Sequence, residues 1–450
     1  MANPKRRMSS QDLVERLEAH PELRERIESL LAVVEDEKGD LKLADDAEER
    51  VIQEMRRMGQ AALQGWALRQ VSSATQEMLR TGKAHREGKK KLHWHTTFGR
   101  LSVEEPQLRC QTKRLRPFLQ SARVSARGVS RPLQRAVTDF GSDLPFAKAM
   151  DKLVEHYGVV VPESTIRRIT LSHSKAVFES TPSEQSWPEQ AGCEVIIAQT
   201  DAGMVPIVQP SATQSDKRKG KELFWKESKL CLAHPLGSVT PTFAGTLQGD
   251  AQMAGRHLFA CATRAGFGTS SYVHVVGDGA PWIAAQVQEQ FGANGHYLVD
   301  FYHVCEYLGA AAKTIAPNEQ AARAWMAEQK ERLKTHKAQD VLQALQPHQE
   351  APGTLDADAP VRQCHRYLTN RMDQLNYREA LNKDLPIGSG EIESAHRYVV
   401  QKRLKLSGCW WRLQNAEHML ALRLNRANQQ WGAYWAGLAA RFASQSGTSV

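Results

Sequence analysis

The sequence lacks the long apolar runs, the apolar leader and the closely spaced cysteines that mark three large classes of protein. No run of about 18 apolar residues occurs in its 450 residues, which argues against a membrane-spanning helix. The basic start at residues 1–7 is not followed by an apolar stretch, so we expect no secretory signal. The 7 cysteines are scattered without zinc-ribbon spacing, as is typical of reduced thiols in the cytoplasm.

Acidic residues are too few to balance the basic ones, and the excess is concentrated in one segment. There are 59 Lys and Arg against 50 Asp and Glu, a net charge of +9. Residues 1–50 hold 9 basic and 14 acidic residues, whereas residues 81–135 hold 14 Lys and Arg and only 3 Glu. Such a segment favours a polyanionic partner. A hydrophobic content of 41% is enough for packed cores, so we expect a folded protein that binds nucleic acid.

The basic segment alternates cations with aromatic side chains and contains a predicted strand pair around residues 96–104. Phosphate contacts by Lys and Arg release condensed counterions and so stabilise a complex with DNA. The predicted contacts are Lys89, Lys90, Lys91, Lys113, Arg114 and Arg116. A solvated surface with a flexible linker is the alternative interpretation.

Two consecutive helices follow, with a glycine between them. An apolar helical stripe ends at Gly158, and Pro162 opens a second helix over residues 163–174. This pattern predicts a helix-turn-helix, with Arg167 and Arg168 near the start of the second helix as DNA contacts. An ordinary αα-hairpin has the same pattern.

From Cys193 onward, short apolar strands alternate with helices. We expect strands at residues 195–198, 205–208, 228–234, 239–247, 272–276 and 297–300, and helices at residues 250–265 and 281–291. A turn is predicted at Asp201-Ala202-Gly203. The order of elements predicts an α/β fold with a mixed sheet of the RNase H-like type.

Three carboxylates lie where phosphodiester chemistry needs them. Asp201 closes the first strand, Asp278 follows the strand at 272–276, and Glu393 lies in a helix after Gly388-Ser389-Gly390. Acids from neighbouring strand ends and a facing helix can hold two divalent ions, and oxygen ligands suit Mg²⁺ or Mn²⁺. Taken singly, each acid is also explained by turn chemistry or by a helix N-terminus.

Four runs of residues resemble bacterial insertion-sequence transposases of the DDE type, closest to the ISKra group: IIAQTDAGMVPIV, VVGDGAPWI, LVDFYHVCEYL and LPIGSGEIESAHRYVVQKRLKLSGCWWR. The resemblance spans roughly residues 90–430. It implies Asp201, Asp278 and Glu393 as the catalytic, metal-binding triad, and it favours Glu393 over Glu391. The family's N-terminal Cys motif for zinc is absent from the sequence, so zinc is not predicted.

The resemblance also predicts a function. The expected protein is a DNA transposase that binds the terminal inverted repeats of an insertion sequence and catalyses metal-dependent cleavage and strand transfer into target DNA. It would act as a homodimer or a higher synaptic oligomer, in the cytoplasm, associated with the nucleoid when bound to DNA. The alternatives are an inactive DNA-binding protein on a transposase scaffold and an RNase H-fold nuclease.

Further residues near the triad are candidates for the reaction or for DNA contact. Asp300 and His303 form an Asp-x-x-His pair that resembles one seen in several DDE transposases, and His303 is expected to orient a phosphate or relay a proton. A structural His that caps the next helix or bonds Asp300 is the alternative. The predicted DNA contacts of the last helices are Arg397, Lys402, Arg403 and Lys405. Trp410-Trp411 either stack on a flipped base or, as we favour, pack the last helix on the core.

Five regions are expected from these patterns. They are a helical N-terminal region (1–80), a basic DNA-binding region with the helix pair at 144–174 (81–190), the first part of the RNase H-like core (191–304), a helical insertion (305–385) and the catalytic helix with the C-terminal helices (386–450).

Overall fold

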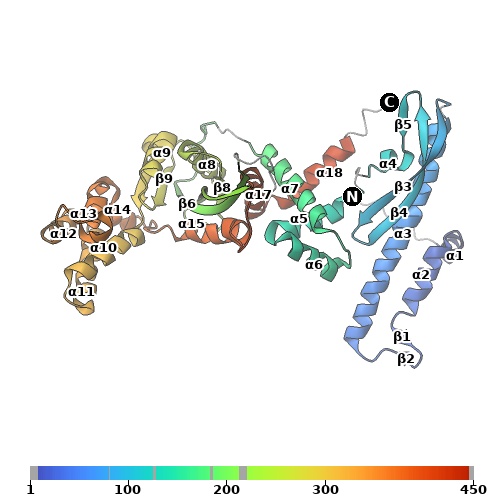
Figure 1. Ribbon diagram of the computed structural model, residues 1–450, viewed down its shortest axis with the longest axis horizontal. Coiled ribbons are helices and arrows are strands. Elements are labelled where there is room, and N and C mark those ends of the chain that lie inside the picture. Colours follow the sequence, from blue (N-terminus) through green and yellow to red (C-terminus); the bar gives the residue numbers. More distant parts are fainter. Residues whose placement is uncertain (1–8, 81, 125–127, 183–185, 212–219, 445–450) are drawn as a thin grey trace. The chain divides into compact units, whose positions relative to one another are not determined.

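The computed structural model describes residues 9–80, 82–124, 128–182, 186–211 and 220–444 (Figure 1). The chain divides into two compact units, Met1–Thr170 and Leu171–Val450, each with hydrophobic cores of its own. Among the described helices, none combines the length and the apolar character that crossing a bilayer requires.

The first unit begins with helices, as predicted. Its first elements are α1 (Ser10–Glu18), α2 (Pro21–Leu31), the short strands β1 (Glu35–Asp36) and β2 (Gly39–Asp40), and the long helix α3 (Ala44–Arg80). Pro21 occupies the first turn of α2, where its missing N–H costs no hydrogen bond.

The basic segment forms an antiparallel sheet against α3. Its elements are β3 (Ala84–Thr96), β4 (Gly99–Cys110), β5 (Lys113–Leu115) and the short helix α4 (Pro117–Ser121). The predicted strand pair is confirmed and is longer than expected, because Leu92, Val103 and Phe118 bury one face of the hairpin against Ala67 of α3. The other face stays exposed and carries the charges.

Three helices follow, α5 (Arg131–Asp143), α6 (Phe146–Tyr157) and α7 (Glu163–Ser180), and the boundary between the two units falls within α7. The predicted helix pair is present, and α7 continues past the expected end at residue 174. Gly158 ends α6 in the left-handed conformation, with a φ of 64° that glycine adopts without strain. Leu133, Leu153 and Ile166 join the three helices in one core.

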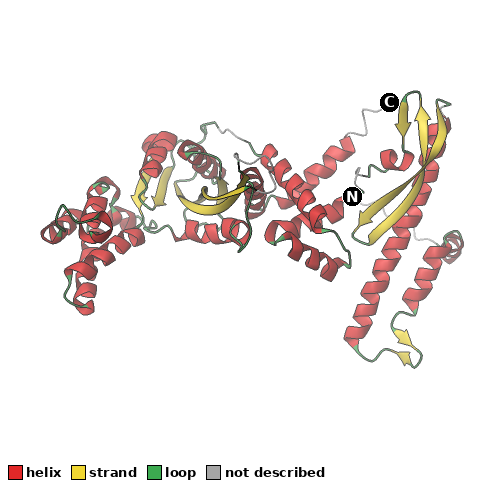
Figure 2. Ribbon diagram, in the orientation of Figure 1, coloured by secondary structure: helices red, strands yellow, loops and turns green. Residues whose placement is uncertain are grey.

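The second unit is built on a five-stranded mixed sheet, so the expected mixed α/β class is confirmed (Figure 2). Its strands are β6 (Val195–Pro210), β7 (Lys221–Pro235), β8 (Thr242–Thr246), β9 (Tyr272–Gly277) and β10 (Gly295–Val299), in the order β10-β9-β6-β7-β8. β6, β7 and β8 are antiparallel, whereas β9 and β10 run parallel to β6. Helices α8 (Ala251–Arg264) and α9 (Pro281–Phe291) share the core on one face of this sheet.

The turn predicted at Asp201-Ala202-Gly203 is wrong, because β6 runs through it without interruption. β7 pairs with β6 continuously, and Ala202 and Gly203 lie opposite Lys229 and Ser228. A Cβ at position 203 would lie 3.0 Å from Nδ1 of His396, so this glycine serves a close side-chain approach instead of a turn.

A helical region follows β10, as predicted. It consists of α10 (Phe301–Ile315), α11 (Glu319–Lys334), α12 (Ala338–Leu345), α13 (Pro360–Thr369) and α14 (Tyr377–Asn382). Four short 3₁₀ turns lie at Gly292–Asn294, Gln346–His348, Asp356–Asp358 and Met372–Gln374.

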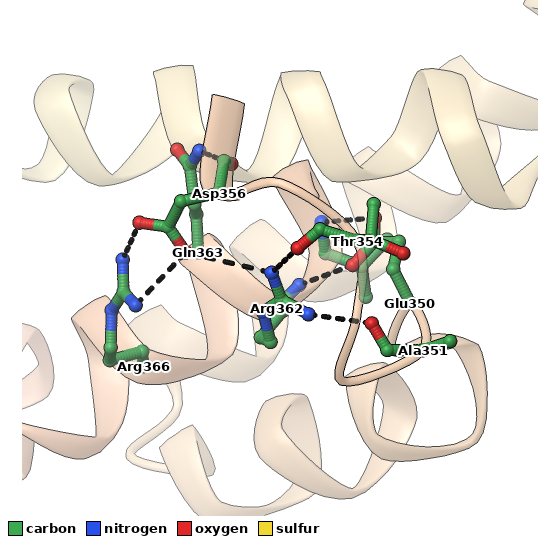
Figure 3. A network of polar contacts seen from close by, with 8 residues as sticks. Glu350, Ala351, Thr354, Asp356, Arg362, Gln363 and Arg366 are labelled. Atoms are coloured by element: carbon green, nitrogen blue, oxygen red, sulfur yellow. Dashed lines mark hydrogen bonds and ion pairs between the residues drawn. The ribbon is translucent and has the colours of Figure 1, made fainter. Parts of the chain in front are cut away.

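A network of polar contacts fixes the loop between α12 and α13 (Figure 3). Glu350 accepts hydrogen bonds of 2.9 Å from the backbone N–H groups of Val361 and Arg362, which are free donors at the start of α13. The Arg362 guanidinium donates in turn to the backbone oxygens of Ala351 and Thr354.

The chain ends in helices that return to the sheet. α15 (Gly390–Ala395) continues through a π-helical turn (His396–Gln401) into α16 (Lys402–Leu404), and α17 (Leu413–Ala427) and α18 (Trp431–Ser444) follow. The predicted helix over 391–405 is thus present with a wider turn in its middle. Such π turns occur frequently at functional sites.

Glu417 of α17 ties the end of β8 to the C-terminal helices, which generates a stability prediction. Its buried carboxylate accepts hydrogen bonds from the Thr246 hydroxyl and from the N–H groups of Leu247 and Gln248. Glu417→Gln turns an amide N–H₂ toward these donors and should lower the free energy of unfolding by about 2–3 kcal/mol. Urea unfolding measures the loss, and the exposed Glu319→Gln should change it by less than about 0.5 kcal/mol.

Candidate active site

Asp201 and Asp278 lie side by side where two parallel strands stop pairing. The last registered pair between β6 and β9 joins Gln199 to Val276. Each acid follows two residues later, so the register brings both to the same level and the same face. Burial raises the pKa of Asp201, and the negative charge of Asp278 acts in the same direction.

The two acids face the side of the sheet that α15 covers. Ile196 and Val273 point into the core shared with α8 and α9, so the alternate residues point to the opposite face. There the Gln199 side chain accepts a hydrogen bond of 2.9 Å from the backbone N–H of Ile392. α15 therefore lies across β6 at the level of the acids.

His396 holds the backbone and the carboxylate of Asp201. Its Nε2 lies 3.2 Å from the Asp201 carbonyl oxygen and 3.7 Å from Oδ2. Burial lowers the pKa of His396 and raises that of Asp201, so desolvation disfavours the charged form of each. Because a carbonyl only accepts, Nε2 of His396 carries a proton in this contact.

Glu391 and Glu393 lie on opposite flanks of α15. Oε2 of Glu391 is 2.9 Å from Nε2 of His234 on β7. At about 100° per residue, Glu393 is turned about 200° from Glu391 around the helix. The Glu393 side chain is exposed and makes no hydrogen bond or ion pair with any described residue. The choice of Glu393 over Glu391 stays a prediction.

Asp300 fixes the start of α15. One carboxylate oxygen accepts hydrogen bonds from the N–H groups of Tyr302 (2.6 Å) and His303 (3.1 Å), which caps α10. The other accepts from the N–H (2.6 Å) and the hydroxyl of Ser389 in the Gly-Ser-Gly turn. Asp300 is buried, so this carboxylate serves as an anchor between α10 and α15.

The His303 side chain has partners of its own. Its Nδ1 lies 3.4 Å from the Glu306 carboxylate, and its ring meets Tyr307 and Tyr367 edge-on. The hydrogen bond that links His303 to Asp300 uses the backbone N–H of His303. Burial raises the pKa of Asp201, and the charge of His303 acts in the opposite direction.

The helical region closes on the turn that carries Asp278. The Tyr367 hydroxyl donates to the Asp278 carbonyl oxygen (2.7 Å), and Arg371 Nε donates to the Gly279 oxygen (2.7 Å). Gly279 has a φ of 87°, and a Cβ there would lie 2.3 Å from the Tyr367 hydroxyl. The turn is thus shaped by α13 and by the absence of a side chain at 279.

The three acids offer oxygen donors that suit Mg²⁺ or Mn²⁺. Within the described ranges, no group of three His, Cys, Asp or Glu side chains is already gathered as a metal site. Asp201 and Asp278 nevertheless fit a cation, because they are neighbouring carboxylates without a Lys or Arg partner among the described residues. Two ions held by Asp201, Asp278 and Glu393 stay a prediction.

Several predicted DNA contacts of the first unit carry acidic partners. Lys89 pairs with Glu104 (2.9 Å), and Arg114 pairs with Glu87 (2.9 Å), both on the exposed face. Arg116 pairs with the fully buried Glu105, which fits a structural role. In the described part of this sheet, the predicted contacts without an ion pair are Lys90, Lys91 and Lys113.

The two arginines of α7 differ in exposure. Arg167 is exposed, whereas Arg168 is half-buried. Arg167 is therefore the better placed of the two for a partner in solution.

The predicted DNA contacts after Glu393 also differ in exposure. Arg397, Lys402 and Lys405 are exposed, but Arg403 is only 1% exposed and lies over the ring of Trp411 at 4.7 Å. That position does not favour the predicted DNA contact of Arg403, because the guanidinium is enclosed by the protein.

Comparison of the sequence with protein-family models gives no match, and comparison with curated proteins gives none either.

Sequence reasoning did not find the contacts that position the acids. Tyr367 and Arg371 are far from Asp278 in sequence, and no local pattern marks them as partners of that turn. The contact of His396 with Asp201 had one available signal, the i, i+3 spacing of His396 from Glu393 on the same helix.

The Asp300 anchor gives a testable prediction. Asp300→Asn removes the charge and turns an N–H₂ group toward Tyr302 or Ser389, so the start of α15 should loosen. Hydrogen exchange at the amides of Ser389 and Glu393 should accelerate at least tenfold, a loss of about 1.4 kcal/mol or more.

Asp250→Asn is the matched control, because Asp250 is also a helix N-cap but lies exposed and bonds only within α8. Unchanged exchange at Ser389 in Asp300→Asn would contradict the anchor.

Proposed function

We propose that this protein is a DNA transposase with an RNase H-like catalytic core and a triad of Asp201, Asp278 and Glu393. The observation that carries the proposal is that Asp201 and Asp278 each come two residues after the last registered pair of the parallel strands β6 and β9, on the sheet face that α15 covers. The strand order β10-β9-β6-β7-β8, with three antiparallel strands on one side, supports the RNase H-like core. The four runs that resemble DDE transposases support the reaction.

The residues have separate tasks in this proposal. Asp201, Asp278 and Glu393 would hold two Mg²⁺ or Mn²⁺ ions, which supply activation of the attacking oxygen and charge stabilisation of the leaving oxygen. His396 holds the backbone of Asp201, and Tyr367 holds that of Asp278, so the carboxylates are oriented before a substrate arrives. His303 lies near Asp201 and orients a phosphate or moves a proton.

The proposed partners are the inverted repeats of the element and target DNA, bound by a dimer or a larger synaptic assembly in the cytoplasm. The exposed cations of β3 and β5 and Arg167 of α7 supply the phosphate contacts. Arg397, Lys402 and Lys405 are also exposed, and they lie on or next to the helical stretch that carries Glu393.

The triad is tested by charge removal. Asp201→Asn, Asp278→Asn and Glu393→Gln should each abolish cleavage and strand transfer of element ends in Mg²⁺ or Mn²⁺, because each deletes a ligand charge at nearly constant shape. A double variant should be no worse than a single one, since the ligands act as a unit. Gel-shift binding of the ends should persist.

Glu391→Gln is the control, two residues from Glu393 on the other flank. It should retain catalysis and lose less than about 1 kcal/mol of stability, because its His234 pair is half-exposed. Activity in Asp278→Asn would refute the metal site. Loss of activity in Glu391→Gln with activity retained in Glu393→Gln would exchange the two roles.

The salt dependence of binding tests the helix pair. Arg167→Ala should weaken binding to the inverted repeat and lower the slope of log K against log salt by about one unit, the signature of one lost phosphate contact. Lys175→Ala, on the same helix but paired with Glu179, should leave the slope unchanged. Equal slopes for wild type and Arg167→Ala would exclude this contact.

A further inference from the structure

Two exposed tryptophans from distant parts of the chain meet on the second unit. Trp225 of β7 is 53% exposed, and Trp410, after α16, is 41% exposed. Their ring centroids lie 6.2 Å apart with the planes tilted by 59°. Large aromatic side chains left in solvent as a pair indicate a binding surface more often than isolated ones do.

The backbone holds this pair in place. Trp225 lies opposite Pro206 in the register of β6 and β7. On the other edge of β6, the N–H of Trp411 donates to the Pro206 oxygen, and the N–H of Val208 donates to the Trp411 oxygen (2.8 Å). The segment of Trp410 is thus joined to β6 as a short extra strand, so both rings belong to one pre-formed surface.

The surroundings of the pair are basic. Lys405 Nζ lies 5.9 Å from the centroid of the Trp225 ring. Residues 394–416 contain five Lys and Arg and no Asp or Glu. Lys402, Lys405 and Arg412 are exposed, and none of them pairs with a carboxylate among the described residues.

The surface lies at a fixed distance from the triad. Pro206 follows Asp201 by five residues along β6, about 17 Å at the rise of a strand. Lys405 lies directly after the helical stretch that begins with α15 and carries Glu393. The surface and the three acids are thus connected through β6 and through this stretch.

We propose that Trp225, Trp410 and Lys405 form a binding site for unpaired DNA, in which bases stack on the tryptophan rings and Lys405 contacts a phosphate. The centroid separation is that of a direct aromatic pair, so bases stack on the open faces of the rings instead of between them. In paired DNA the faces of the bases are covered by stacking, so they are not open to the tryptophan rings. A protein partner gains little from lysines and arginines that have no carboxylate partner. The site rests on the proposed function, because that function brings DNA to this face.

The test measures binding of the full-length protein to a labelled oligothymidine of about twelve nucleotides by fluorescence anisotropy, without divalent metal. Trp225→Ala and Trp410→Ala should each weaken binding about 5- to 100-fold, the range found when a stacking aromatic is removed. Trp225→Phe and Trp410→Phe should retain most of the affinity. Trp187→Ala is the control, since Trp187 is 46% exposed but packs on Phe259 and Phe267.

The proposal is overturned if both alanine variants bind the oligonucleotide as wild type does, or if the alanine and phenylalanine variants lose affinity equally. A change of oligomeric state with unchanged affinity would reassign the surface to a protein partner. Asp278→Asn should bind the oligonucleotide normally. Failure of cleavage therefore bears on the triad alone, and failure of stacking on this site alone.

Discussion

The carboxylate of Asp300 is the contact on which the geometry of the second unit depends. It sits at the end of β10, caps α10, and accepts two hydrogen bonds from Ser389 at the start of α15. The end of β10 and the start of α10 are thus tied to Ser389, which lies 89 residues further along the chain. A buried carboxylate is costly unless its oxygens accept hydrogen bonds, so the strand, the helical region and the covering helix depend on one another.

The sheet illustrates how far sequence reasoning reaches. Alternating apolar strands and helices after Cys193 predicted a mixed α/β sheet, and Asp278 does follow the end of β9, but Asp201 lies inside β6 and does not end a strand. The helix boundaries at Gly158 and Pro162 were predicted as well, because the backbone preferences of proline and glycine are local. Local chemistry was sufficient for these elements.

Long-range contacts were not readable in the same way. Asp201-Ala202-Gly203 has good turn chemistry, yet β7 pairs across it and His396 occupies the space beside Gly203. Arg403 belongs to a basic stretch that predicts solvent exposure, but the fold buries it over Trp411. In both cases a partner distant in sequence determines the outcome, and no window of neighbouring residues contains it.

β6 continues past Asp201 without a break, so the spacing of the residues along this strand is constant. A turn after Asp201 would let the far end of the strand move as a separate arm, whereas continuous pairing with β7 fixes the separation between Asp201 and Pro206 in whole residues. About 17 Å of strand separates the two residues. The side chains beside Pro206 therefore keep a constant separation from Asp201, which a flexible turn between them would not provide.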